Sequence, residues 1–213
     1  MDETSITAAG VIDTFLVLLI GVGPKLALVP YLQITASLDR ATRGRVQRKM
    51  LTTAAAVAVV LMVLGELLRA LLHFTIGSLS IAGGVILLIL AVSMVLKPPA
   101  DGGDLPDGTD PMRLAQFPLA VPYLLNPVGI VGLMTISADA ESLSVFAVAL
   151  GLLALVFGLD VVVFRWAGRV SEKLDENRML VTEKVFGFLI AAIAVQLVLD
   201  GLTAVGVIAP IQH

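Results

Sequence analysis

The sequence predicts an all-α integral membrane protein with six transmembrane helices in two inverted three-helix repeats. Hydrophobic residues make up 58% of the 213 residues and charged residues 15%, with a mean hydropathy of +0.99. A water-soluble domain carries about 25% charge and about 45–50% apolar residues. Two further observations support the prediction: lysine and arginine concentrate in alternate loops, and two apolar segments are interrupted at matching places.

Six apolar segments approach or exceed the length of about 20 residues that a transmembrane helix needs. The first is too long for one straight crossing, which fits a tilted and broken helix. The first three segments form one repeat within residues 1–97, the last three form a second within 114–213, and residues 98–113 are a loop rich in proline, glycine and aspartate. The predicted spans cover about residues 7–37, 50–72, 79–96, 114–137, 144–167 and 181–207.

The positive charges predict the orientation of these spans. Twelve of the 14 lysines and arginines lie in or beside the loops after spans one, three and five, and the two exceptions are Lys25 and Arg69. Cytoplasmic loops collect lysine and arginine. We therefore expect a multi-pass plasma-membrane protein, with residues 98–113 in the cytoplasm and both termini outside.

Spans one and four each contain a sequence that breaks a helix near mid-membrane. Span one contains Gly21-Val22-Gly23-Pro24-Lys25-Leu26, and span four contains Asn126-Pro127-Val128-Gly129. Proline cannot donate the helical hydrogen bond, and glycine is a poor helix former. Interruptions in corresponding places of two halves indicate a transporter binding site near the midplane.

The two halves match at a constant offset of 103 residues. This offset relates Pro24 to Pro127, Gly84 to Gly187, and the segment 91–96 to the segment 194–199. Because each half contains an odd number of spans, the two halves must cross the membrane in opposite directions. The sequence therefore predicts an inverted-topology repeat.

Lys25 is the most informative residue for function. It lies roughly 20–25 Å from the outer end of span one if the helix rises 1.5 Å per residue. It follows the break directly, so it adds its charge to the partial positive charge at the start of the second half-helix, a combination suited to a carboxylate or phosphate. The alternative is a lysine that extends toward the cytoplasmic face or pairs with a buried carboxylate. The predicted substrate-binding residues are Gly23, Pro24, Lys25, Asn126, Pro127 and Gly129.

Other polar residues in the spans are candidates for coupling. Asp160 lies at about the depth of Lys25, and a pair between them would either relay a proton or substrate or fix helix packing. Glu66 and Arg69 lie one turn apart, so Glu66 either pairs with Arg69 or faces a cavity. The predicted coupling residues are Asp160, Glu66, Gln196 and Asp200.

Two weaker arrangements involve the outer third of the spans. Asp13, Glu66 and Asp200 would offer oxygen ligands to a cation if they met, but their spacing matches no metal motif, so no metal site is predicted. Gln196 and Ser93 occupy equivalent positions in the two repeats and suit hydrogen bonds between helices.

The sequence contains no signature of an enzyme. Metalloprotease, nucleophile-elbow, phosphate-loop and dinucleotide motifs are all missing, so we predict no catalytic residue and no cofactor. The basic segment after span one is explained by membrane orientation and lacks interleaved aromatic residues, so we predict no nucleic-acid binding.

Several segments resemble the MarC family of integral membrane proteins: Ser80–Gly84, Phe117–Pro122, Ala191–Gly201 and the dipeptide Gly65-Glu66. The resemblance extends over nearly the whole chain. It implies a place among the LysE-type exporters, whose six helices form two inverted repeats, in a family whose members mostly have no established substrate. The chain departs from the family at both breaks. Residues 23–26 replace an Asn-Pro-x-Gly pattern, and Asn126 stands where a Gly-Pro-Gly is more frequent.

Two functional hypotheses follow from these observations. The first is a transporter or exporter of a small anionic or zwitterionic solute, with one central site at the two breaks. The alternative is a non-transporting lipid-binding or accessory membrane protein, in which the breaks and small residues such as Ala54 and Ala58 serve helix packing. The expected partners are the lipid bilayer and a small solute. The sequence is also compatible with a homo-oligomer.

Overall fold

The structure is a computed structural model that describes residues 7–96, 110–139, 142–170 and 176–209. These residues contain helices and turns and no β-strand, which confirms the all-α prediction. The predicted loop 98–113 lies largely outside the described residues, as do the charged residues 171–175. In chain order the elements are α1 (Ala8–Val22), α2 (Leu28–Thr35), α3 (Arg40–Leu72), α4 (Ile76–Leu96), α5 (Pro111–Leu114), the wide-turn segment η2 (Ala115–Leu124), α6 (Pro127–Asp139), α7 (Leu143–Val170) and α8 (Glu176–Ala204).

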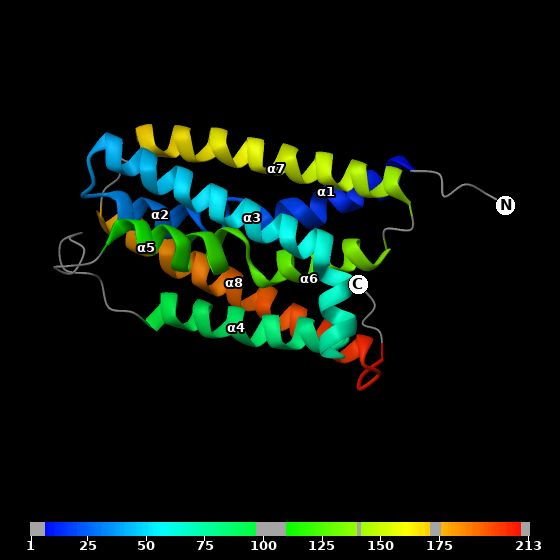
Figure 1. Cartoon of the computed structure of the whole chain (residues 1–213). Coiled ribbons are helices and arrows are strands. Elements are labelled where there is room, and N and C mark those ends of the chain that lie inside the picture. Colours follow the sequence, from blue (N-terminus) through cyan, green and yellow to red (C-terminus); the bar gives the residue numbers. More distant parts are fainter. Residues whose placement is uncertain (1–6, 97–109, 140–141, 171–175, 210–213) are drawn as a thin grey trace.

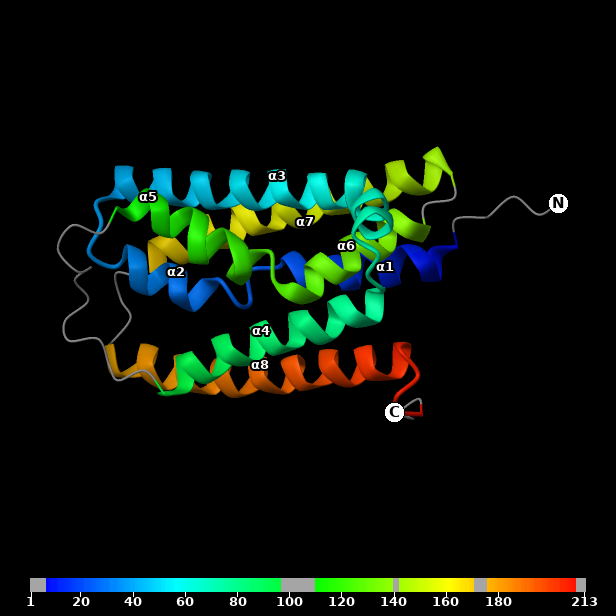
Figure 2. The same ribbon diagram turned by 60° about the horizontal axis from the view of Figure 1, so that its bottom comes forward.

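The helices lie side by side in an elongated bundle whose connections gather at two ends (Figure 1). A main core joins α1, α2, α3, η2, α6 and α7, and a smaller core joins α4 and α8 to the residues around the breaks. Figure 2 shows α4 and α8 as an antiparallel pair along one side of the bundle. α1 begins and α8 ends at the same end of the bundle (Figure 1).

Among the described residues, four helices have the length and hydropathy to cross a membrane, and a bent pair of helices makes a fifth segment if it counts as one span. The four are α3, α4, the Leu143–Ala167 part of α7 and the Lys184–Ala204 part of α8. The fifth is the pair Pro111–Leu124 and Pro127–Asp139, which is bent by 67°. A sixth crossing requires α1 and α2 to act as one broken span, so the number six and the inverted repeat stay predictions.

The basic segment predicted as a linker is helical. α3 begins at Arg40, ten residues before the predicted span, and includes the five basic residues of that segment. Asp39 starts the helix by accepting hydrogen bonds from the backbone N–H groups of Ala41 (3.0 Å) and Thr42 (3.1 Å). Hydropathy marks the part of a helix in lipid, whereas arginine, lysine and glutamine are good helix formers in water.

The first predicted break is confirmed. α1 ends at Val22, and Gly23 continues in extended backbone with φ −80° and ψ 166°. Pro24–Ala27 forms a turn in which the N–H of Leu28 donates to the carbonyl oxygen of Pro24 (2.8 Å), and α2 follows. The first span is therefore two short helices joined by a five-residue interruption.

The second break lies slightly earlier than predicted. η2 contains extended backbone at Phe117 and Val121, each of which precedes a proline, and it ends before Leu125. Pro127, predicted to be part of the interruption, is instead the first residue of α6. Proline suits the first turn of a helix because the N–H that it lacks would have no partner there. The break therefore comprises Leu125 and Asn126.

Glycine allows α4 and α8 to pack closely. A Cβ built on Gly84 would lie 2.7 Å from the carbonyl oxygen of Ala194 and 2.6 Å from a methyl of Val198. A Cβ built on Gly187 would lie 3.3 Å from the carbonyl oxygen of Ala91 and 2.7 Å from a methyl of Val95. Ala194 and Val198 follow Ala91 and Val95 by 103 residues, just as Gly187 follows Gly84. The two glycines therefore make equivalent contacts in the two halves of the chain.

We predict that Gly84→Ala destabilises the protein by about 1–3 kcal/mol, because its new methyl group meets backbone atoms that cannot move independently. Gly187→Ala costs less, because the nearest backbone atom to its new methyl group, the carbonyl oxygen of Ala91, lies at 3.3 Å, whereas that of Ala194 lies 2.7 Å from the methyl group at Gly84. Gly158→Ala is the control: it has open space within 4 Å and gains up to about 1 kcal/mol of helix propensity. Denaturant unfolding in detergent measures all three, and equal effects would contradict the packing argument.

A second prediction concerns Asp39, which lies outside the membrane spans. Hydrogen bonds from the side chain and backbone of Thr42 hold the pKa of its carboxyl below the ordinary value, with smaller contributions from Ala41 and Arg45. A carboxyl with a lowered pKa stabilises the folded state above its unfolded pKa, and this stability is lost as the pH falls through the folded pKa. Asp39→Asn keeps a helix cap but does not titrate. We therefore expect the two thermal midpoints to differ at neutral pH and to converge in acid, whereas parallel pH curves would refute this role.

Candidate functional site

The two helix breaks meet where α1 ends and α6 begins. Asn126 makes three hydrogen bonds there: its backbone N–H donates to the carbonyl oxygen of Gly21 (3.0 Å), its Nδ2 donates to that of Ile20 (2.9 Å), and its Oδ1 accepts from the N–H of Gly129 (3.2 Å). The last carbonyls of a helix and its first N–H groups lack partners within the helix. Asn126 satisfies such groups of both helices. We call Ile20, Gly21, Asn126 and Gly129 the break junction.

The helix backbones touch at the break junction because both contact residues are glycine. A Cβ added to Gly21 would overlap the backbone of Gly129, and one added to Gly129 would overlap the carbonyl group of Gly21. Asn126 is completely buried between the helices. Asn126 and Gly129 are among the predicted site residues, whereas Ile20 and Gly21 are not. The spacing of Gly21 and Gly23 before Pro24 was the available signal.

Lys25 lies in the turn that follows the first break. It is half-buried, and the described residues include no hydrogen-bond or ion-pair partner for its ammonium group. The N–H groups of Lys25, Leu26 and Ala27 donate to no backbone carbonyl in the described part of the chain. Leu26 packs in the smaller core and Ala27 in the main core, so this turn lies between the two. Three N–H groups without a backbone acceptor among the described residues and one cation therefore lie immediately after the break.

Asp160 is fully buried on α7, and neither of its carboxylate oxygens has a hydrogen-bond partner. The expected ion pair with Lys25 is therefore not formed in this structure. The two residues were matched by depth along their helices, but depth does not fix the direction in which a helical residue faces. The structure places Asp160 among residues of the main core, which includes Ala27 and Tyr31 of the first span.

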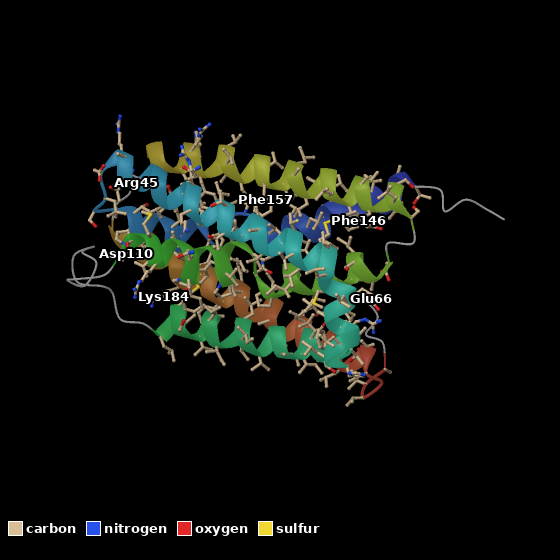
Figure 3. The ribbon with its side chains drawn as sticks, viewed as in Figure 1. Arg45, Glu66, Asp110, Phe146, Phe157 and Lys184 are labelled. Carbon is tan, nitrogen blue, oxygen red and sulfur yellow. The ribbon has the colours of Figure 1, made fainter. Side chains whose placement is uncertain are left out.

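The other predicted coupling residues are paired within their own helices. Glu66 accepts two hydrogen bonds from Arg69, from Nε at 2.7 Å and from Nη2 at 2.6 Å, so the ion-pair alternative is the one that the structure shows. The Nε2 of Gln196 donates to Oδ1 of Asp200 (2.7 Å). Figure 3 shows Glu66 near the end of the bundle opposite to Arg45, Asp110 and Lys184.

Two weaker arrangements that the sequence suggested are not seen among the described residues. Ser93 donates to the carbonyl oxygen of Leu90 in its own helix (2.7 Å), and Gln196 bonds to Asp200, so neither makes the expected bond between helices. Asp13, Glu66 and Asp200 do not form a cation site, since the described residues contain no group of three His, Cys, Asp or Glu side chains arranged for a metal. Carboxylates at a similar depth on different helices need not face a common point.

Long side chains at the end with Arg45 and Lys184 hold neighbouring elements together. The Nη2 of Arg43 donates to the carbonyl oxygens of Thr35 (3.2 Å) and Leu38 (3.5 Å), at the end of α2, where the last carbonyls of the helix lack intrahelical donors. The Nζ of Lys184 on α8 donates to the carbonyl oxygen of Met94 on α4 (2.9 Å). The sequence argument assigned Arg43 only to membrane orientation and therefore missed that it closes the half-helix after the first break.

The apolar helices and the two joined breaks define the chain as a polytopic α-helical membrane protein. Residues 9–205 match the MarC family, whose description is MarC family integral membrane protein. The chain belongs to this family, which confirms the resemblance seen in its motifs.

Curated relatives cover nearly the same length. The UPF0056 inner membrane protein YhgN of Escherichia coli (strain K12) is 27% identical over 190 residues, which cover 87% of this chain and 93% of that protein. The UPF0056 membrane protein YvbG of Bacillus subtilis (strain 168) is 23% identical over 81% of this chain and 84% of its own. A UPF0056 membrane protein of Archaeoglobus fulgidus is 24% identical over 89% and 90%. No solved structure matches the chain.

We predict that Asn126 is required to hold the break junction together. Asn126→Ala leaves the part-buried carbonyl of Ile20 and the buried N–H of Gly129 without their partner, and an unsatisfied buried group costs about 1–3 kcal/mol. Asn126→Ser keeps an oxygen that can cap α6 but is too short to reach Ile20, so it should be more stable than the alanine variant by about 1 kcal/mol. Unfolding in detergent measures both. Equal stability of Asn126→Ala and the parent would show that the junction does not depend on this side chain.

Proposed function

We propose that this MarC family member transports a small anionic or zwitterionic solute across the plasma membrane. In this proposal α1 and α2 form one broken crossing, which brings the number of crossings to six, with both termini outside. The solute site lies beside the break junction at mid-membrane. Gly23, Pro24 and Lys25 form one side of the site, and Asn126, Pro127 and Gly129 hold the other.

The observation that carries the proposal is the composition of the turn after the first break. Lys25 supplies a half-buried positive charge without a described partner, and the adjacent N–H groups are free. A cation at this depth is costly for the protein unless it has a role, since insertion of a charged side chain costs about 2.5–3.5 kcal/mol at the centre of a membrane helix. Anions bind at the start of a helix through the same N–H groups and the helix dipole. A carboxylate or phosphate group matches this combination.

The packing of α4 against α8 supports the inverted repeat on which the proposal relies. Gly84 contacts Ala194 and Val198. Gly187, which is 103 residues after Gly84, makes the reciprocal contact with Ala91 and Val95. Two copies related by a two-fold axis give such reciprocal contacts. Inverted repeats of this kind allow one half to rock against the other around a central site.

The described contacts also narrow the coupling candidates. Glu66 is neutralised by Arg69, and Gln196 and Asp200 bond to each other, so their polar groups already have partners. Asp160 has none. We therefore assign coupling to Asp160 and a structural role to the other three.

A second candidate function is a non-transporting accessory or lipid-binding protein, and one observation favours it. All three hydrogen-bonding groups of Asn126 at the break junction are already used by protein partners, and Gly21 and Gly129 leave no space between their backbones. Breaks that are filled in this way also serve packing alone. Under this function Lys25 extends to the headgroups, and a stoichiometric partner should copurify with the protein.

A thermal-shift experiment with Lys25 variants separates the two functions. Purified protein is screened against small carboxylates, phosphates and amino acids, beside Lys25→Met and Lys25→Arg. A ligand at one hundred times its Kd stabilises the native state by about 2.7 kcal/mol. We expect an anionic solute to stabilise the parent and, to a smaller degree, Lys25→Arg, but not Lys25→Met, and the same solute to be taken up by proteoliposomes.

The opposite result would support the accessory function. In that result no solute stabilises the protein, and Lys25→Met is at least as stable as the parent. The second outcome is expected because a cation without a role only destabilises a protein in the membrane.

A further inference from the structure

Asp160 interrupts an otherwise apolar stripe on α7. Its neighbours on the stripe are spaced three or four residues apart, which places them on one face of the helix. Asp160 has no exposed surface, and both its oxygens lack hydrogen-bond partners, so it is the one buried acid of the described chain without compensation. The buried residues of the stripe are Ala149, Leu153, Val156, Asp160, Phe164 and Ala167.

The packing of Tyr31 against Phe164 locates Asp160 relative to the first break. The two rings meet edge to face with centroids 5.0 Å apart. α2 and α7 run in the same direction through the bundle (Figure 1). Ala27 lies one turn before Tyr31, and the N–H of Tyr31 donates to the carbonyl oxygen of Ala27. In the same way, Asp160 lies one turn before Phe164. Asp160 is therefore level with Ala27, in the turn whose N–H groups are free.

The charged and titratable groups on the elements packed against α7 do not compensate Asp160. On the side of the first span these are Lys25 and Tyr31, and Tyr31 packs one turn away against Phe164. On α3, Arg43 is bonded to the end of α2, while the amide of Gln47 donates to the carbonyl oxygen of Val161 (3.4 Å). None of these side chains makes a hydrogen bond to the carboxyl group of Asp160.

The remaining groups lie nearer the ends of the helices. α1 contributes Asp13, one turn into that helix, and α6 contributes Asp139 as its last residue. Glu66 and Arg69 of α3 are paired with each other. The other basic residues of α3 lie in its first ten positions: Arg40, Arg45, Arg48 and Lys49.

We propose that Asp160 is the proton-binding residue of this protein and is neutral in the conformation described here. A buried carboxylate without a hydrogen bond or counter-charge is strongly disfavoured, and a buried carboxylic acid is not. The proposal deepens the proposed function by naming the coupling ion, and only its coupling step rests on that function.

The proton step links the charge of Asp160 to the contact between α2 and α7. In this step the O–H bond of the Asp160 carboxyl group breaks and water accepts the proton. A carboxylate then remains at the level of Ala27. The closed contact provides no donor for this carboxylate, so the contact must loosen, either to admit water or to bring the free N–H groups of the turn within reach. Protonation restores the closed contact.

Infrared spectroscopy of the protein in lipid nanodiscs tests the protonation state without any solute. A neutral carboxylic acid gives a carbonyl band that is separate from carboxylate bands. We expect this band at neutral pH in the parent and its loss in Asp160→Asn, while the control Asp13→Asn keeps it. Asp160→Glu keeps a carboxyl and shifts the band, which assigns it independently if the asparagine variant does not fold. An identical spectrum for the parent and a folded Asp160→Asn would overturn the proposal.

Cysteine labelling tests the conformational link, and the natural absence of cysteine gives it no background. Ala27→Cys places a thiol in the closed contact, and Ala41→Cys places one in an exposed position outside the membrane. With a small water-soluble methanethiosulfonate, the ratio of the labelling rate of Ala27→Cys to that of Ala41→Cys should rise several-fold with pH in the parent and stay constant in the Asp160→Asn background. The same rise in both backgrounds would overturn the link.

These outcomes are independent of the solute. Asp160→Asn mimics the neutral acid and leaves Lys25 in place, so it should retain stabilisation by an anionic solute while losing the pH response. Failure of the solute screen with a positive carboxyl band would refute transport of an anion but not the proton site. Solute binding without the carboxyl band would refute the proton site but not transport of an anion.

Discussion

The structure depends on three hydrogen bonds made by Asn126. Lipid cannot bond to the backbone groups that a broken helix releases, so each break must find partners inside the protein or line a water-filled cavity. Asn126 bonds to the last carbonyls of α1 and to the first N–H groups of α6, and so joins the two breaks. Gly21 and Gly129 make the bonds possible because their backbones touch. Both breaks would be unstable without this connection.

Much of the fold could be predicted because its causes are local or compositional. Pro24 stops α1 through a missing N–H, and apolar length identifies the crossing segments. The start of α3 could not be predicted from hydropathy, since its first ten residues include five arginines and lysines and depend on the cap at Asp39. The shift of the second break has a similar reason. Pro127 ends helices within an apolar run but begins one when a capping Asn126 precedes it.

The candidate site was harder to predict because it depends on how helices are rotated. Counting residues placed Lys25 and Asp160 at one depth, and the structure agrees that Asp160 is level with the turn containing Lys25. Depth does not determine facing, however, and apolar neighbours on all sides leave little periodicity in the sequence to indicate it. The ion pair between Glu66 and Arg69 could be predicted as one of two alternatives. Two residues one turn apart on the same helix lie on the same face, so their spacing does determine the direction in which they point.

The first break is satisfied on one side and unsatisfied on the other, and this asymmetry connects the fold to its proposed activity. The carbonyl groups of Ile20 and Gly21, at the end of α1, are held by Asn126. Within the described part of the chain, the N–H groups of the following turn have no backbone acceptor, and Lys25 and Asp160 beside them have no counter-charge. A protein that used its breaks only for packing would gain stability by replacing these two residues with apolar ones. A cation and an acid that remain unpaired on either side of a free helix start are instead suited to partners that come and go, an anion at Lys25 and a proton at Asp160.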